Sequence, residues 1–366
     1  MSGTVLHKGT PNAVSTDGRD IDQNVGKLSG EAAEQRASGA AEKHIKSYAQ
    51  NWKSLPDEDA SDTTYYDRPM LNDPVWEWAI PTYYYVGGLT GASLALAAAS
   101  QIGDASSREG LIRRGHTIGL IGACVSGGLL IYDLGVPSRF YNMLRVFRPT
   151  SAMNMGAWIL SGTGGTAFGA LLFRGRGGII GLLGEFCGYL AGIFGAGLAT
   201  YTGVLVSGSA VPIWQASRKI LPLLFGASAM SSAGAFFEIF SSNPEERRIT
   251  NIFGAVGQGT EIIAAIVMEK QASVVPRVGR PFKRGLSGFL WRTAAVLTIG
   301  TMASALIPKG TRKRRIIVAA LGTLGSALMR MSIEKIGTAS ARDARASFHQ
   351  QRAGYGAAEM TKARSA

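Results

Sequence analysis

Ionisable side chains are rare in the long apolar stretches of this chain, and four of them lie well inside such stretches. Glu261 stands near the middle of one stretch, and Glu185, Glu238 and Arg292 lie in others. A charged group inside a bilayer is costly, so such a residue is a functional hypothesis by default. We therefore predict that these four residues form a proton route. A buried pair between Glu261 and Arg292 that only fixes helix packing is the structural alternative.

A second polar signature begins at Asp133, which ends an apolar stretch. Three arginines follow within a short loop: Arg139, Arg145 and Arg148. One interpretation is a helix end followed by arginines that bind lipid headgroups. The arginines and the aromatic residues around them also suit an ordered surface for a partner protein. Asp133 itself is a candidate proton acceptor.

Cysteine and histidine are too scarce for a redox centre. The two cysteines, Cys124 and Cys187, both fall in apolar stretches, whereas an iron–sulfur cluster needs about four thiolates. Of the four histidines, only His116 lies at the boundary of an apolar stretch, so no histidine pair can hold a haem between helices. We predict no haem, no iron–sulfur cluster and no other metal site in this chain.

Membrane helices must position these residues, because the middle of the chain reads as eight apolar stretches of about 20 residues, the length that spans a bilayer. We predict spans over 79–102, 115–134, 153–173, 181–206, 220–240, 250–268, 286–307 and 315–333. The fold class is therefore all-α integral membrane, a bundle of eight transmembrane helices. Eight spans place both chain ends on one side, which we name side A; the opposite side is side B.

Composition divides the chain into three parts. Residues 1–74 are a polar arm that we predict to be largely disordered, and this arm has no apolar stretch typical of a signal peptide. Residues 75–335 form the membrane domain, and residues 336–366 form a polar tail. The net charge of +13 fits Lys and Arg that meet anionic membrane lipid at the ends of the spans, and does not indicate nucleic-acid binding.

Several motifs occur in the order typical of a known family. They are Trp-x-Trp-x-Ile-Pro-x-Tyr-Tyr-x-x-Gly-Gly from Trp76, Asp-Leu-Gly-x-Pro-x-Arg-Phe from Asp133 with Pro-Thr-Ser-x-Met beyond it, Tyr-Thr-Gly-Val-Leu from Tyr201, and Val-Pro-Ile-Trp ending at Trp214. The chain thus resembles the NrfD/PsrC-type membrane subunits of polysulfide-reductase-like complexes over about 69–333. It departs from them at Ala152, where the family often has proline, and in its longer polar arm.

The resemblance implies the function. Such subunits lie in the inner (cytoplasmic) membrane as multi-pass proteins and bind a quinone, either menaquinone or ubiquinone. They exchange electrons with a ferredoxin-like iron–sulfur subunit, which serves a molybdopterin catalytic subunit, and the loop after Asp133 contacts that iron–sulfur partner. The resemblance places the quinone contacts at Tyr201, Tyr83, Tyr84, Trp78 and Glu77. We therefore expect quinol oxidation or quinone reduction, with Tyr201, Asp133 and Glu261 as the catalytic residues.

Two other classes of protein remain open at this point. One is a non-catalytic anchor or proton-translocating relative that keeps the fold without a quinone site, and it would differ at Tyr201 and at the start of the first span. The other is a secondary transporter, which typically has broken helices and internal repeats. The two halves of this sequence show no obvious repeat.

Overall fold

The computed structural model describes residues 21–22, 27–28, 71–72, 74, 76, 78–103, 105–241, 243–305 and 311–352. The chain has two units, Met1–Lys53 and Ser54–Ala366. In the first unit, the strands β1 (Ile21–Asp22) and β2 (Lys27–Leu28) pair antiparallel. The remainder of the predicted arm up to residue 70 lies outside the described residues, so its predicted disorder stays a prediction.

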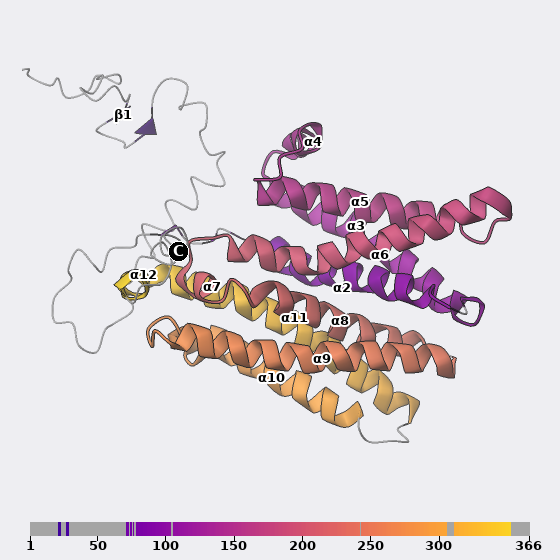
Figure 1. The fold of residues 1–366 in the computed structure, drawn as a ribbon. Coiled ribbons are helices and arrows are strands. Elements are labelled where there is room, and N and C mark those ends of the chain that lie inside the picture. The colour runs from indigo at the N-terminus through magenta and orange to yellow at the C-terminus, as the bar shows by residue number, and fades with distance from the viewer. Residues whose placement is uncertain are drawn as a thin grey trace, which may run out of the picture. The chain divides into compact units, whose positions relative to one another are not determined.

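The second unit is helical (Figure 1). Its described residues form eight helices of 20 to 31 residues: α2 (Ala79–Ser100), α3 (Glu109–Asp133), α5 (Ala152–Phe173), α6 (Gly178–Ser207), α8 (Leu221–Phe240), α9 (Pro244–Ser273), α10 (Gly285–Ala305) and α11 (Arg312–Arg342). Three short helices adjoin the side-A ends of the long ones: α4 (Phe140–Arg145), α7 (Pro212–Ala216) and α12 (Ala344–Arg352).

Six of the helices in the described part combine the length and the apolar composition needed to cross a membrane. They are Ser106–Asp133, Ala152–Phe173, Gly178–Ser207, Leu221–Phe240, Pro244–Ser273 and Arg312–Arg342. The other two predicted spans are present as α2 and α10, which have similar length but a more polar composition. Helix α2 carries Pro81 and three tyrosines, and α10 carries Arg292 and several Ser and Thr residues. The prediction of eight transmembrane helices is therefore confirmed in part.

The long helices form two groups of four. Helices α2, α3, α5 and α6 pack together, and so do α8, α9, α10 and α11. The two groups meet where α2 and α6 contact α8 and where α11 contacts α2 (Figure 1). Residues that α2, α6, α8 and α11 direct into this junction come from distant parts of the sequence, and the candidate site is built from them.

Polar caps fix where several helices begin. The side-chain oxygens of Ser151, Asn243 and Thr311 each accept a hydrogen bond from a backbone amide in the first turn of α5, α9 and α11. These bonds satisfy backbone donors that have no partner within the helix. Pro244 follows Asn243 at the first position of α9, where a missing amide proton costs nothing.

Glycine allows two pairs of helices to approach closely. A Cβ on Gly234 of α8 would overlap the backbone of Gly254 on α9, and a Cβ on Gly91 of α2 would overlap the backbone oxygen of Gly195 on α6. Small residues at such crossings let helix backbones touch in a membrane, where packing and not water drives association.

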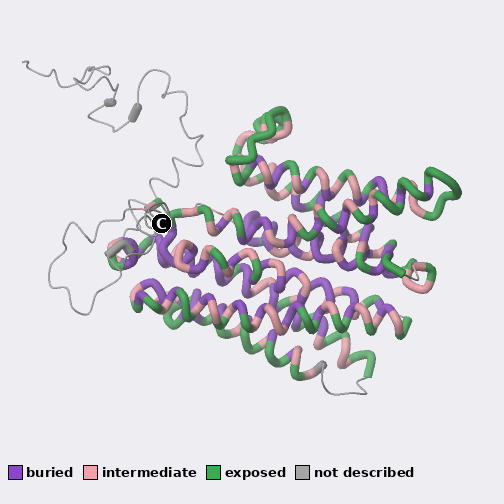
Figure 2. Tube along the Cα trace, in the orientation of Figure 1, coloured by how far each residue is buried: buried purple, intermediate pink, exposed green. Residues whose placement is uncertain are grey.

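The outer faces of the helices carry large apolar side chains, whereas the purple, buried positions of Figure 2 lie between helices. Ile179 is 85% exposed, Val296 69% and Ile193 68%. Exposed apolar surface of this extent marks a membrane-facing protein.

The predicted polar tail is partly structured. Helix α11 continues to Arg342, and Ile336 and Ala341 are buried in the main core. Asp343 pairs with Arg277 at 2.9 Å, and the Ser340 hydroxyl accepts a hydrogen bond from the Ile213 amide at 3.3 Å. Helix α11 therefore runs through the predicted boundary at 335, because a polar sequence can continue a helix beyond the membrane.

Candidate functional site

Three tyrosines converge at the side-A end of the junction. Tyr83 and Tyr84 lie in the second turn of α2, and Tyr201 lies in the last third of α6; all three are buried. We call them the phenol cluster. Tyr83, Tyr201, Asp133 and Glu334 all act electrostatically on the phenol of Tyr84. The sequence prediction thus named four of these five residues, and Glu334 of α11 is the addition.

The hydroxyl groups of the phenol cluster differ in their hydrogen bonds. The Tyr201 hydroxyl donates to the backbone oxygen of Ala152 at 2.6 Å. Neither the Tyr83 nor the Tyr84 hydroxyl has a hydrogen-bond partner among the described residues, although both side chains are 1% exposed or less. A buried polar group without a partner loses its bonds to water without compensation, so these two hydroxyls are the groups that a ligand would satisfy.

Gly156 leaves the space that the ring of Tyr201 occupies. A Cβ on Gly156 would overlap the ring and the hydroxyl of Tyr201. Any side chain at this position of α5 would therefore push the ring aside and break its bond to Ala152. This relationship gives a structural reason for glycine four residues after Ala152.

Tryptophans close the site beside Tyr84. Trp76 stacks on Trp214 with ring centroids 5.7 Å apart and meets the Tyr84 ring edge-on at 5.9 Å. The Trp214 indole N–H donates to the backbone oxygen of Ile333 at 3.2 Å. The short helix α7 therefore packs on α11 and on the chain that precedes α2.

One of the predicted quinone contacts, Trp78, is not part of this cluster. Trp78 is 61% exposed and faces Tyr132 of α3, with ring centroids 5.6 Å apart. Glu77 lies outside the described residues. Asp133 is half-buried at the end of α3, and its charge acts on Tyr84.

Arg330 is a fully buried cation in the middle of the bundle, and the sequence prediction missed it. Its guanidinium donates to the backbone oxygen of Tyr84 at 2.7 Å and to that of Phe225 through a second nitrogen. It also lies over the Phe225 ring, 4.9 Å from the centroid. Hydrogen bonds to charged groups and contact with an aromatic face both stabilise a buried cation.

The predicted pair between Glu261 and Arg292 is not found. Arg292 is exposed and donates to the backbone oxygen of Lys283 at 2.9 Å. Arg330 instead provides the positive charge that acts on Glu261. Arg292 lies on the outward face of α10, so its side chain points away from Glu261 on α9.

Glu261 is buried at 3% exposure on α9. Ser228 and Ser231 of α8 lie close enough to interact with its carboxyl group, yet neither carboxyl oxygen has a hydrogen bond of normal geometry within the described part. Glu261 also lines a cavity of about 120 Å³ between α9 and α10, together with Glu269 and Trp291. A space of this size can hold several waters.

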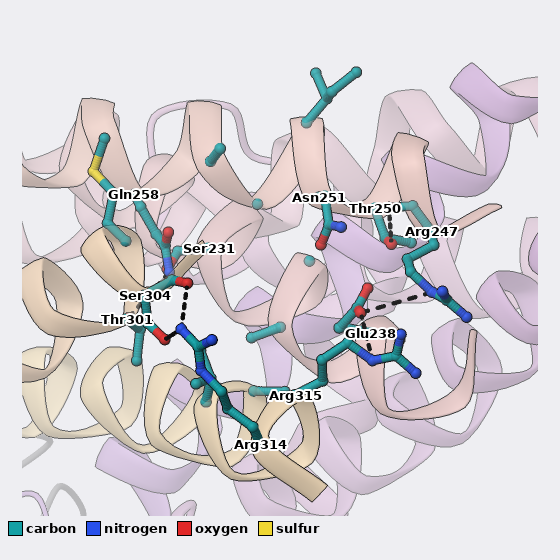
Figure 3. Close-up of a pocket in the computed structure, with 18 residues that line it drawn as sticks. Ser231, Glu238, Arg247, Thr250, Asn251, Gln258, Thr301, Ser304, Arg314 and Arg315 are labelled. Atoms are coloured by element: carbon teal, nitrogen blue, oxygen red, sulfur yellow. Dashed lines mark hydrogen bonds and ion pairs between the residues drawn. The ribbon is translucent and has the colours of Figure 1, made fainter. Parts of the chain in front are cut away.

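The remaining predicted proton carriers lie elsewhere. Glu238 ends α8 on side B, where it faces Arg315 at 3.7 Å and Arg247 at 3.9 Å (Figure 3). Glu185 lies on an exposed part of α6, in the other group of four helices from Glu261. The structure therefore brings neither of them to Glu261.

The three predicted docking arginines lie in an ordered side-A loop, which we call the docking loop (134–151). Asn154 holds this loop: its side chain accepts a hydrogen bond from the Arg148 amide at 2.7 Å and donates to the oxygens of Met143 and Val146. Arg139, Arg145 and Arg148 are all exposed, as are Phe147 and Tyr141 beside them. An exposed surface with arginine and aromatic residues suits a protein interface.

Three functional candidates were missed from the sequence: Arg330, Glu334 and Glu269. Arg330 had a clear signal, because it is an arginine inside the predicted span 315–333. Glu334 and Glu269 each lie one residue beyond a predicted span, so the search for ionisable residues inside the spans did not include them. In the part of the chain that the structure describes, no group of three or more His, Cys, Asp or Glu is placed to hold a metal ion.

Comparison with known proteins finds a family match over part of the chain. Residues 68–243 match the model of the family described as polysulphide reductase, NrfD, which confirms the resemblance drawn from the motifs. The matched range contains the phenol cluster, Asp133 and the docking loop, and it ends before Glu261 and Arg330. No curated protein matches the chain.

Proposed function

We propose, because this chain belongs to the polysulphide reductase NrfD family through residues 68–243, that its phenol cluster binds a membrane quinone. As a family member, the chain is a multi-pass membrane subunit of a polysulfide-reductase-like oxidoreductase complex. The finer proposal is that it exchanges electrons between the quinone pool of the inner membrane and an iron–sulfur partner subunit. That partner would in turn serve a molybdopterin catalytic subunit.

One observation carries the proposal: the buried hydroxyls of Tyr83 and Tyr84 have no hydrogen-bond partner among the residues that the structure describes, and two carboxyl groups act on Tyr84. A phenol hydroxyl can donate to a quinone carbonyl and can also accept from a quinol hydroxyl. The same two groups can therefore hold both forms of the substrate. The Tyr201 hydroxyl already donates its one hydrogen bond to the backbone oxygen of Ala152, so it can only accept a hydrogen bond from the ligand.

The reaction balances with the groups that lie at the site. Oxidation of one quinol releases two electrons and two protons. Glu334 and Asp133 are the two carboxyl groups whose charges act on Tyr84, and they would receive the protons. The electrons would pass one at a time to an iron–sulfur cluster held by the partner, which the docking loop would bind on side A. Quinone reduction is the same sequence in reverse.

Single Tyr→Phe substitutions test this site. We expect Tyr83→Phe and Tyr84→Phe to reduce quinol-dependent turnover by roughly tenfold to a hundredfold, because each removes one hydrogen bond of about 1–3 kcal/mol to a buried ligand. Their melting temperatures should not fall, since these hydroxyls bond no described residue. Activity of the soluble subunits with artificial electron donors should persist.

Tyr201→Phe is the matched control. It removes the bond to Ala152, so it should lower stability by about 1 kcal/mol in addition to any effect on turnover. If Tyr83→Phe and Tyr84→Phe both leave quinol turnover intact, the quinone binds elsewhere. This outcome would favour the non-catalytic anchor.

A second function, proton transfer through α9, is favoured by the surroundings of Glu261. Its carboxyl group has no hydrogen bond of normal geometry to the described residues, and it shares a cavity with Glu269, which lies about 12 Å nearer side A along the helix. We expect Glu261→Gln and Glu269→Gln to slow quinol turnover while binding of a quinone analogue survives. Glu185→Gln, an exposed carboxyl on α6, is the control. Equal turnover in all three variants would exclude this route.

A further inference from the structure

A basic cleft lies on side B, far along the helices from the phenol cluster. It has a volume of about 540 Å³, and its walls come from α9 on one side and from α10 and α11 on the other, with α8 between them (Figure 3). Helix α8 contributes Glu238, α9 contributes Arg247, and α11 contributes Arg314 and Arg315. The quinone site and the docking loop use none of these residues.

The charges in this cleft do not balance. Three arginines and a single carboxylate line the cleft. Two of the arginines face that carboxylate, and their contacts are long: Arg315 lies 3.7 Å and Arg247 3.9 Å from Glu238. A saturated bond between guanidinium and carboxylate measures about 2.7–2.9 Å. In addition, the Nε of Arg247 and one oxygen of Glu238 are buried without a hydrogen bond in the described region. Arg247 and Arg315 therefore retain the capacity to bind another anion.

Arg314 is held beside them. Its guanidinium donates to both the backbone and the hydroxyl oxygen of Ser304, each at 3.1 Å (Figure 3). These bonds fix the third positive charge at the mouth of the cleft without neutralising it. An anion in the cleft would thus meet a net charge of about +2.

The walls of the cleft beyond the arginines are largely apolar. Ile252, Ala255, Met302 and Val318 line them, and Ile252 is 55% exposed on the outer face of α9. The cleft therefore borders the surface that faces lipid. A ligand that fits both parts has a phosphate for the arginines and a hydrocarbon chain for the apolar wall.

We propose that this basic cleft binds the phosphate of an anionic phospholipid, with Arg247 and Arg315 as its ligands. Glu238 then has a defined role: it keeps the two arginines in place and weakens the site by its own charge. A zwitterionic lipid brings an ammonium group that meets the surplus positive charge and is disfavoured. Basic pockets between transmembrane helices are known to hold anionic headgroups.

Lipid retention by the intact complex tests the proposal. The complex is purified in mixed micelles of phosphatidylglycerol and phosphatidylcholine, and the retained lipids are counted by mass spectrometry. We expect selective retention of phosphatidylglycerol, reduced about fivefold in affinity by Arg247→Gln and by Arg315→Gln. Arg312→Gln is the matched control, because Arg312 is an exposed arginine of the same helix turn and does not line the cleft.

Glu238→Gln separates a binding site from a merely structural ion pair. It keeps all three arginines and removes the competing carboxylate, so retention of phosphatidylglycerol should rise by about fivefold. This variant also decides the matter if the arginine variants fail to assemble. Equal retention of both lipids, or unchanged retention in Glu238→Gln, would overturn the proposal. Displacement of the lipid by millimolar inorganic phosphate would instead assign the cleft to a free anion and overturn the lipid.

Discussion

Arg330 and Tyr84 are joined by a hydrogen bond of 2.7 Å from the guanidinium to the backbone oxygen, which ties the last long helix to the first. The same guanidinium bonds the backbone of Phe225 in α8. Arg330 therefore connects the two groups of helices directly behind the phenol cluster. A substitution at Arg330 should therefore change the position of Tyr84.

Replacement of Arg330 should destabilise the bundle. Arg330→Gln leaves two backbone oxygens and Glu261 without their cation, and breaking a buried charge interaction of this kind costs about 3–5 kcal/mol. Thermal unfolding of the detergent-solubilised protein measures the loss. Arg292→Gln should change stability little, since Arg292 is exposed. The double variant with Glu261→Gln should recover part of the loss, and equal losses in the two arginine variants would contradict this role.

Gly88 should tolerate no side chain. A Cβ at this position would lie 2.7 Å from the guanidinium carbon of Arg330, and the guanidinium cannot move away without losing its bonds to α2 and α8. We expect Gly88→Ala to lower the melting temperature and to reduce quinol turnover. Gly128→Ala on α3, where a Cβ meets nothing within 4 Å, should be neutral or slightly stabilising. A neutral Gly88→Ala would show that Arg330 can be repositioned.

Charge reversal in the docking loop should weaken assembly. Arg145→Glu and Arg148→Glu place acids on the surface that we assign to the iron–sulfur partner, and the loss of a close charge contact at an interface costs about 2–5 kcal/mol. Native gels of the purified complex report it. Arg284→Glu, an exposed arginine in another side-A loop, is the control. An intact complex with both reversals would mean that the loop faces lipid headgroups.

Truncation should reveal that the end of α11 is structural. A chain that stops after residue 335 loses Asp343, the partner of Arg277, and the buried residues Ile336 and Ala341. We expect less folded protein in the membrane and a lower melting temperature. A chain that stops after residue 352 keeps all of these contacts and should behave as the full chain does. Equal behaviour of the two truncations would contradict the assignment.

The sequence predicted five of the eight long helices, α2, α5, α6, α8 and α10, to within three residues at each end, because the apolar length that crosses a bilayer is a strong signal. It underestimated α9 and α11, which continue through polar residues at their ends, such as Glu245 and Arg342. Hydropathy marks where a helix is inside the membrane and not where the helix stops. Helix α11 therefore continues past residue 335, where the predicted polar tail begins.

The pairing of charges between helices could not be predicted in this way. Counting residues along a span gives the depth of Arg292 and Glu261, but it does not give the direction in which each side chain points. Only packing decides that Arg292 faces outward and that Arg330 faces Glu261. The phenol cluster was predicted because family motifs, and not depth alone, marked Tyr83, Tyr84 and Tyr201.

Arg330 also bears on the order in which the chain is built into the membrane. Helices α2 and α8 are synthesised before α11, so the backbone oxygens that receive Arg330 are in the bilayer when it arrives. An arginine at the centre of an isolated helix opposes insertion by roughly 2.5–3.5 kcal/mol. The oxygens of Tyr84 and Phe225 offset this cost. Membrane insertion of α11 therefore depends on α2. In a chain that lacks α2, Arg330 would enter the bilayer without the backbone oxygen of Tyr84 as a hydrogen-bond acceptor.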